Sequence, residues 1–170
     1  MKYFEMKKRT AFIGTILSLI PLGQPLIIKT SIALSISGLV LSFSNKVQAE
    51  DARFYYMRAL EKSNAGDLYG AICEYTKAIS INPPSDPNTA MLYVNRGNAK
   101  ANLGDYKGSL DDYNKAVGIN PNYALAYFNR GVTMEILGDI NIACSDWERA
   151  SSLGDEQSKT LLQKKCKSNN

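Results

Sequence analysis

A Gly-Asp pair followed by an apolar or aromatic residue occurs three times in this chain. The copies begin at Gly66, Gly104 and Gly138, so they are separated by 38 and then 34 residues. A fixed period of this size is the signature of architectures in which similar units stack against one another. The sequence therefore predicts a stack of three related units.

The residues around each Gly-Asp pair also return in the same order. In the second unit they are Tyr93, Asn95, Arg96, Gly97, Leu103, Leu110, Tyr113, Ala116 and the run Ile119-Asn120-Pro121. In the third unit the corresponding residues are Tyr127, Asn129, Arg130, Gly131, Leu137, Trp147, Ala150 and Leu153. Apolar and small residues recur every three or four positions, which is the period of an amphipathic helix. Each unit is therefore expected to form two helices, with the repeated glycine ending the first and the aspartate capping the second.

This unit resembles the tetratricopeptide repeat, a helix-turn-helix unit of about 34 residues, over roughly residues 52 to 157. The resemblance, to a protein of the exported bacterial type, implies an all-α fold: a right-handed α-solenoid of three units (52–89, 90–123 and 124–155) within a domain at 50–155. A capping helix and tail are expected at residues 156–170, because the last unit of a solenoid needs its apolar face covered. A four-residue insertion, 86–89, is expected to lengthen the first unit's exit turn and to loosen its join to the second unit.

An apolar leader at residues 1–49 precedes the repeats. It has a basic start at Lys7-Lys8-Arg9, apolar stretches at 11–28 and 32–43, and a small-residue end at 47–49. That order predicts a signal peptide cleaved after Ala49, with translation starting at Met1 or Met6. The alternative is a retained membrane anchor in which residues 10–45 contact the membrane, although each apolar stretch is shorter than a spanning helix needs. In both cases the repeats are expected outside the cytoplasm, in a periplasm or lumen.

The charge balance argues against nucleic-acid binding. The chain has 20 Lys and Arg and 16 Asp and Glu; residues 1–49 hold six of the former and one of the latter, which leaves 14 and 15 after residue 49. Phosphate binding needs clustered basic residues on the folded domain, and the repeats are close to neutral.

The three cysteines are consistent with an exported domain. A capping helix that packs against the third unit's second helix would bring Cys144 and Cys166 within bonding range, and an oxidising compartment permits the bond. We therefore predict a disulfide between them, with two buried thiols as the alternative. Cys73 has no obvious partner and is either buried or available for intermolecular pairing.

No catalytic or metal-binding pattern is present in the sequence. The chain has no His, which removes the commonest general base and metal ligand. No Cys-x-x-Cys pairing or phosphate-binding glycine run occurs, and the adjacent Asp111 and Asp112 are interpreted as a solvated face. The prediction is a non-enzymatic protein with no cofactor and no metal.

The resemblance implies that the concave surface, lined by the first helix of each unit, binds a peptide or helix of a partner protein. The expected groove residues are Tyr56, Leu60, Met91, Val94, Asn98, Leu125, Phe128 and Val132. Asn95 and Asn129 either donate hydrogen bonds to this ligand or join neighbouring repeats. Tyr56, Leu60 and Leu125 stand where relatives that bind chaperone tails carry Lys, Asn and Lys, so that activity is not expected.

The predicted function is a scaffold or assembly module that contacts another protein through an apolar strip. The alternative is a self-associating structural repeat protein held at a membrane by its N-terminus.

Overall fold

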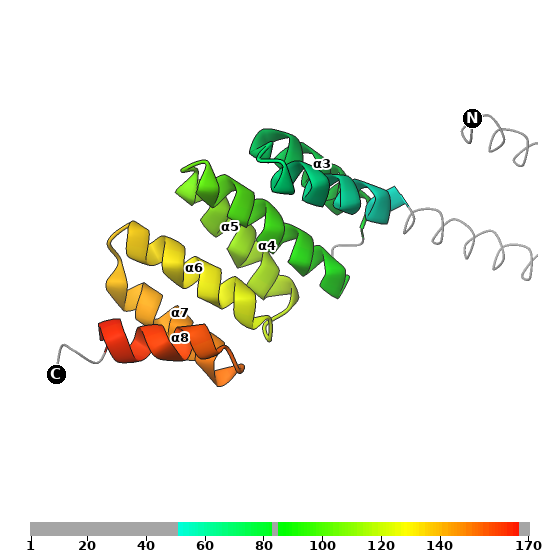
Figure 1. The fold of residues 1–170 in the computed structure, drawn as a ribbon. Helices are drawn as coiled ribbons and strands as arrows, with labels where there is room; N and C mark the ends of the chain where they lie inside the picture. Colours follow the sequence, from blue (N-terminus) through cyan, green and yellow to red (C-terminus); the bar gives the residue numbers. More distant parts are fainter. Residues whose placement is uncertain (1–50, 83–84, 167–170) are drawn as a thin grey trace, which may run out of the picture. The chain divides into compact units, whose positions relative to one another are not determined.

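The computed structural model describes residues 51–82 and 85–166, and this part of the chain consists of helices joined by short turns (Figure 1). After a helix at residues 51–64 come α3 (Leu68–Ile81), α4 (Pro87–Asn102), α5 (Tyr106–Ile119), α6 (Ala124–Ile136), α7 (Ile140–Ser152), α8 (Glu156–Leu161) and the π-helix η3 (Leu162–Cys166). The predicted leader, its cleavage site and its anchor lie outside the described residues.

The helices form three antiparallel pairs followed by a cap. Helix 51–64 pairs with α3, α4 with α5, and α6 with α7, and consecutive pairs pack through α3 against α4 and α5 against α6. The first helices of the second and third units, α4 and α6, also touch, while α8 and η3 cover α7. The predicted all-α solenoid is confirmed.

The turn within each unit, and the turn before the cap, use the same glycine and aspartate chemistry. Gly66, Gly104, Gly138 and Gly154 have φ of 80°, 82°, 87° and 95°, a left-handed conformation that glycine adopts without steric cost. The aspartate after each glycine accepts a hydrogen bond from the backbone N–H three residues on, at 2.6 to 3.3 Å. The end of the first helix and the start of the second helix in each unit were therefore predicted correctly from these residues.

The insertion before the second unit mainly extends a helix. Residues 82–86 separate α3 from α4 and residues 120–123 separate α5 from α6, so the predicted lengthening of the turn amounts to one residue. Asp86 caps α4 by accepting from the Asn88 N–H at 2.8 Å, and Pro87 is the first helical residue, where its missing N–H costs nothing. Leu92 of α4 packs in one apolar cluster with Ala71 and Tyr75 of α3. The join between the first two units is therefore packed, not loose.

Two glycines allow the paired helices to approach closely. A Cβ added at Gly97 would lie 2.7 Å from the Tyr113 ring, and one at Gly131 would lie 2.7 Å from Trp147 Nε1 and 3.1 Å from a backbone oxygen. These contacts explain why both positions are glycine, because no side chain fits where an aromatic ring occupies the space.

A repeated arginine joins the helices within and between units. Arg96 donates through Nε and Nη2 to both carboxylate oxygens of Asp112, 16 residues later, and through Nη1 to Thr76 of the preceding unit. Arg130 makes the same contacts with Asp146 and with Asn114 of the second unit. The repeated Asn-Arg-Gly run therefore supplies inter-repeat contacts through its arginine.

Asp112 is buried, which corrects the interpretation of Asp111 and Asp112 as one solvated face. Asp111 is exposed, as expected, whereas Asp112 also pairs with Lys100 Nζ at 2.8 Å. Successive residues on a helix point about 100° apart, so only one of two neighbours faces the partner helix.

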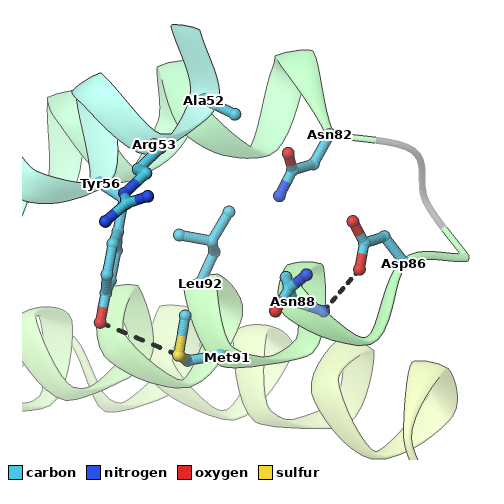
Figure 2. Close-up of a pocket in the computed structure, with 8 residues that line it drawn as sticks. All are labelled: Ala52, Arg53, Tyr56, Asn82, Asp86, Asn88, Met91 and Leu92. Carbon is cyan, nitrogen blue, oxygen red and sulfur yellow. Dashed lines mark hydrogen bonds between the residues drawn. The ribbon is translucent and has the colours of Figure 1, made fainter. Parts of the chain in front are cut away.

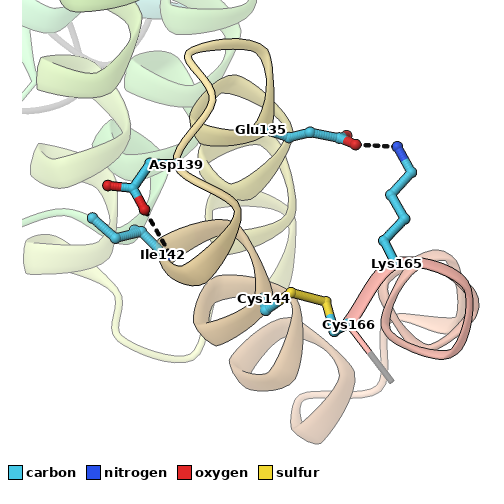
Figure 3. The surroundings of a disulfide bond; sticks show 6 residues. All are labelled: Glu135, Asp139, Ile142, Cys144, Lys165 and Cys166. Carbon is cyan, nitrogen blue, oxygen red and sulfur yellow. Dashed lines mark hydrogen bonds and ion pairs between the residues drawn. A yellow bond between two sulfur atoms is a disulfide. The ribbon is translucent and has the colours of Figure 1, made fainter. Parts of the chain in front are cut away.

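The C-terminal cap differs in detail from the predicted single helix. Its α-helical part ends at Leu161 and continues as the π-helical turn η3, which carries Lys165 and Cys166. The structure joins Cys166 to Cys144 of α7, with the two Cα atoms 5.9 Å apart, and Lys165 pairs with Glu135 of α6 (Figure 3). Whether the bond forms in the cell remains a prediction. Cys73 is exposed and forms no disulfide in the described part of the chain.

Candidate functional site

The predicted groove residues come from three helices and differ in accessibility. Leu125 is exposed, and Tyr56, Leu60, Met91, Asn98, Phe128 and Val132 are half-buried. Val94 is fully buried in a cluster with Tyr113 and Ala126, so its assignment to an open groove is wrong. Its short side chain ends within the seam where α4, α5 and α6 meet and does not reach the surface.

Some of the predicted groove residues line hollows in the described part of the chain. The first, here called the N-terminal hollow, has a volume of about 310 Å³ and is lined by Ala52, Arg53, Tyr56, Asn82, Asp86, Asn88, Met91 and Leu92. The second, the central hollow, has a volume of about 440 Å³ and is lined by Asn98, Ala101, Asn102, Tyr106, Tyr113, Asn129, Val132, Thr133 and Ile136. Tyr56, Met91, Asn98, Asn129 and Val132 are the predicted site residues that take part in them.

Two hydrogen bonds fix the orientation of the Asn98 side-chain amide in the central hollow. Its Oδ1 accepts a hydrogen bond from the Tyr113 hydroxyl at 2.8 Å and another from Asn129 Nδ2 at 2.9 Å. Burial raises the pKa of Tyr113 to about 12, so this hydroxyl remains a donor even at moderately alkaline pH. Because both bonds go to its oxygen, Asn98 must present its Nδ2 hydrogens to other acceptors.

The two predicted ligand donors, Asn129 and Asn95, differ in their contacts and in their position relative to the hollows. Asn129 joins α6 to α4 through Asn98, which is an inter-repeat contact, and it also lines the central hollow. Asn95 is half-buried and lines neither hollow. Only one of the two predicted ligand donors is thus placed at a concave site.

The N-terminal hollow has an apolar floor and a polar rim (Figure 2). Ala52 and Leu92 are buried at its base, and the Tyr56 hydroxyl points at Met91 Sδ, 3.8 Å away. Arg53 stands on the side of Tyr56, whereas Asn82, Asp86 and Asn88 stand on the other side of Leu92.

Sequence reasoning missed several lining residues and included others that line no hollow. Leu60, Leu125 and Phe128 lie outside both linings, as does Val94. Asn102 was missed, although its spacing of four from Asn98 indicates one polar face of a helix. Arg53 occupies the same position of its unit as Met91 and Leu125, which is a signal for the first-helix side. Asn82, Asp86 and Asn88 had no such signal, because their meeting depends on where α4 begins.

Residues 51–82 and 85–166 contain neither a metal-binding cluster nor a membrane-spanning helix. No group of three or more His, Cys, Asp or Glu in this part of the chain is arranged to hold a metal ion. Within the same residues, no helix has the length and apolarity required to cross a bilayer.

Comparisons with known proteins agree with this geometry. The family model described as "TPR repeat" matches residues 97–138, and "Tetratricopeptide repeat" matches residues 52–85. A comparison with curated proteins gave no match.

Solved structures of similar fold include domains with bound peptides. The first TPR of Spaghetti (RPAP3) bound to the HSP90 peptide SRMEEVD is 27% identical, with a TM-score of 0.61 over 68% of this chain and 90% of that one. The second TPR domain of human RPAP3, in complex with the HSP70 peptide SGPTIEEVD, is 28% identical, with a TM-score of 0.59 over 71% and 96%. The Arabidopsis OM64 TPR domain, at 24% identity, has a TM-score of 0.63 over 69% and 95% and supports the fold alone.

Proposed function

We propose that this chain, a tetratricopeptide-repeat protein, is a non-catalytic interaction module whose first-helix side binds an extended peptide segment of a partner protein. Two structures of similar fold hold a peptide, which supports a peptide as the class of ligand. The central hollow is the part of this chain that we assign to binding.

The orientation of Asn98 is the observation that carries the proposal. With Oδ1 held by Tyr113 and Asn129, its Nδ2 group is directed to an acceptor that the described residues do not supply. A peptide carbonyl is such an acceptor, and Asn102 offers a second amide one turn away. Val132 and Ile136 give an apolar wall for an adjacent side chain.

The central hollow does not favour an acidic peptide tail. No Lys or Arg lines it, and Tyr56, Leu60 and Leu125 are uncharged at the positions where chaperone-binding relatives are expected to be basic or polar. A peptide that is uncharged where it enters this hollow is therefore the ligand we expect.

Selection of random phage-displayed peptides on the full-length protein tests the proposal. The selected peptides should lose at least tenfold in affinity for Val132→Asp, because a carboxylate would be placed against the apolar wall. The matched control is Ile142→Asp, on an exposed site of α7 outside both hollows. Equal binding by all three proteins would exclude the central hollow as the site.

A location outside the cytoplasm, in assembly or scaffolding, is part of the same proposal. The pairing of Cys144 with Cys166 supports it, since disulfides persist in oxidising compartments. N-terminal sequencing of the protein recovered from cells tests the location: a start at Glu50 supports export with cleavage. A retained start in a soluble cytoplasmic fraction would contradict it.

Self-association is a second candidate, favoured by the uncovered outer face of the first unit. Phe54 is 56% exposed, whereas its equivalents in the second and third units, Leu92 and Ala126, are 2% and 0% exposed because the preceding unit covers them. If a second copy covers Phe54, the protein should sediment as a dimer. The Phe54→Asp variant should then sediment as a monomer. Tyr69→Asp, at a more exposed aromatic residue of α3, is the control.

A further inference from the structure

The N-terminal hollow differs in character from the central hollow because charged side chains stand at its rim. It is also confined to one join between units. At the next join, Arg149 Nη2 donates to Pro121 O at 3.1 Å and to Asn122 Oδ1 at 3.3 Å, which ties that turn to α7. The insertion before α4 instead brings Asp86 and Asn88 to the edge of a hollow.

The volume and floor of this hollow suit one apolar side chain. About 310 Å³ is at the lower end of the range of about 300–1,000 Å³ found for ligand pockets. Leu92 and Ala52 form a buried apolar base, and Met91 is a flexible, polarisable wall that adapts to different shapes.

The two charges are placed on opposite sides of that floor. Arg53 is exposed, and it has no ion-pair partner among residues 51–82 and 85–166, so its guanidinium is available to a carboxylate. Asp86 uses one oxygen, Oδ1, to cap α4, and its other oxygen accepts no hydrogen bond within the described chain. Figure 2 shows Leu92 between them.

We infer that the N-terminal hollow binds an extended peptide in which an apolar residue lies between an acidic and a basic residue. The apolar side chain rests on Leu92, the acidic group pairs with Arg53, and the basic group pairs with Asp86. The amides of Asn82 and Asn88 lie beside the path of the peptide and match the donors and acceptors of its backbone. This inference rests on the proposed peptide-binding function and adds the sequence class of the ligand.

Fluorescence polarisation with three labelled peptides tests the inference on the full-length protein at low ionic strength. The peptides are Ser-Glu-Leu-Lys-Ser, the exchanged order Ser-Lys-Leu-Glu-Ser, and the neutral Ser-Gln-Leu-Gln-Ser. One charged order should bind about five- to tenfold more tightly than the neutral peptide, because two opposed pairs form in only one direction. Equal affinity of all three peptides overturns the inference.

Two variants and two matched controls assign the effect to the hollow. Arg53→Gln and Asp86→Asn should each remove most of the difference in affinity between the better charged peptide and the neutral peptide. The asparagine introduced by Asp86→Asn can still cap α4. Lys107→Gln and Asp111→Asn, at exposed positions of α5, should leave this difference in affinity unchanged. A loss of this difference in the controls as large as in the variants would contradict the assignment.

The outcome separates this inference from the proposed function. The peptides selected on the full-length protein are tested with Val132→Asp, which leaves Arg53 and Asp86 in place. If Val132→Asp weakens their binding while charge order has no effect, the proposed function stands and the inference fails. If Val132→Asp does not weaken their binding and charge order has no effect, both fail.

Discussion

Replacing Arg130 by Gln is expected to destabilise the fold more than the same change at either equivalent arginine. The guanidinium of Arg130 donates to both oxygens of Asp146 at 2.8 and 2.6 Å and to Asn114 Oδ1 at 2.7 Å. Asp146 is buried, and Arg130 is its one ion-pair partner in the described residues. The same contact raises the pKa of Arg130, chiefly through the hydrogen bonds that Arg130 donates to Asp146.

The loss of unfolding free energy on replacing the arginine by Gln should differ among the three units. Removing one partner of a buried ion pair costs about 3–5 kcal/mol, and we expect about 3 for Arg130→Gln because 19% of that side chain meets solvent. Arg96→Gln should cost about 2 kcal/mol, since Lys100 remains 2.8 Å from Asp112. Arg58 is 46% exposed and 3.7 Å from Glu74, so Arg58→Gln should cost at most about 1 kcal/mol.

Urea unfolding of the full-length variants, followed by the fluorescence of Trp147 and by circular dichroism, measures this series. With a slope of about 1.5 kcal/mol per molar urea, 3 kcal/mol lowers the midpoint by about 2 M. Arg58→Gln is the matched control, because it removes the same charge from the same position of a unit. Equal midpoints for all three variants would refute the reasoning from burial and geometry.

Three further predictions concern packing, the cap and alkaline pH. Gly131→Ala should destabilise by about 1–3 kcal/mol through its clash with an aromatic ring, while Gly118→Ala, which meets nothing within 4 Å, should stabilise by about 0.5–1; thermal melts that rank them otherwise would contradict the contacts. Reduction, or Cys166→Ser, should cost about 3 kcal/mol for a loop of 22 residues, and mass mapping that finds free Cys144 in the purified protein would remove this prediction. The unfolding free energy should fall as pH rises from about 10 to about 12, because unfolded tyrosines ionise near 10 and burial raises the folded pKa of Tyr113 to about 12; Tyr113→Phe should make that fall shallower, and an unchanged slope would count against it.

The helices and their ends are predictable because short-range chemistry determines them. A left-handed glycine followed by an aspartate cap, as at Gly104 and Asp105, needs no information from the rest of the fold. Asp86 and Pro87 belong to the same kind of signal, and an insertion that contains them extends a helix. Counting the insertion as extra turn length ignores this start signal.

The burial of charged residues is harder to predict, because it depends on which side of a helix meets its partner. Nothing local distinguishes Asp111 from Asp112, yet one is solvated and the other is held by Arg96. A signal exists at longer range: an arginine in each first helix is followed 16 residues later by Glu74, Asp112 or Asp146. A repeat supplies three copies of such a pairing, so it is detectable in one sequence when the units are compared position by position.

The candidate site is the least predictable part, because equivalent positions do not have equivalent neighbours. A rule that assigns the same positions of every unit to a groove places Val94 beside Tyr56 and Phe128, but Val94 is enclosed by the helices on either side of α4. The converse holds for Phe54, whose equivalents are buried only because a preceding unit covers them. Accessibility in a stack of so few units is therefore set by a unit's place in the stack and by the size of its neighbours, so the terminal and inserted positions are where binding surfaces specific to this chain should be sought.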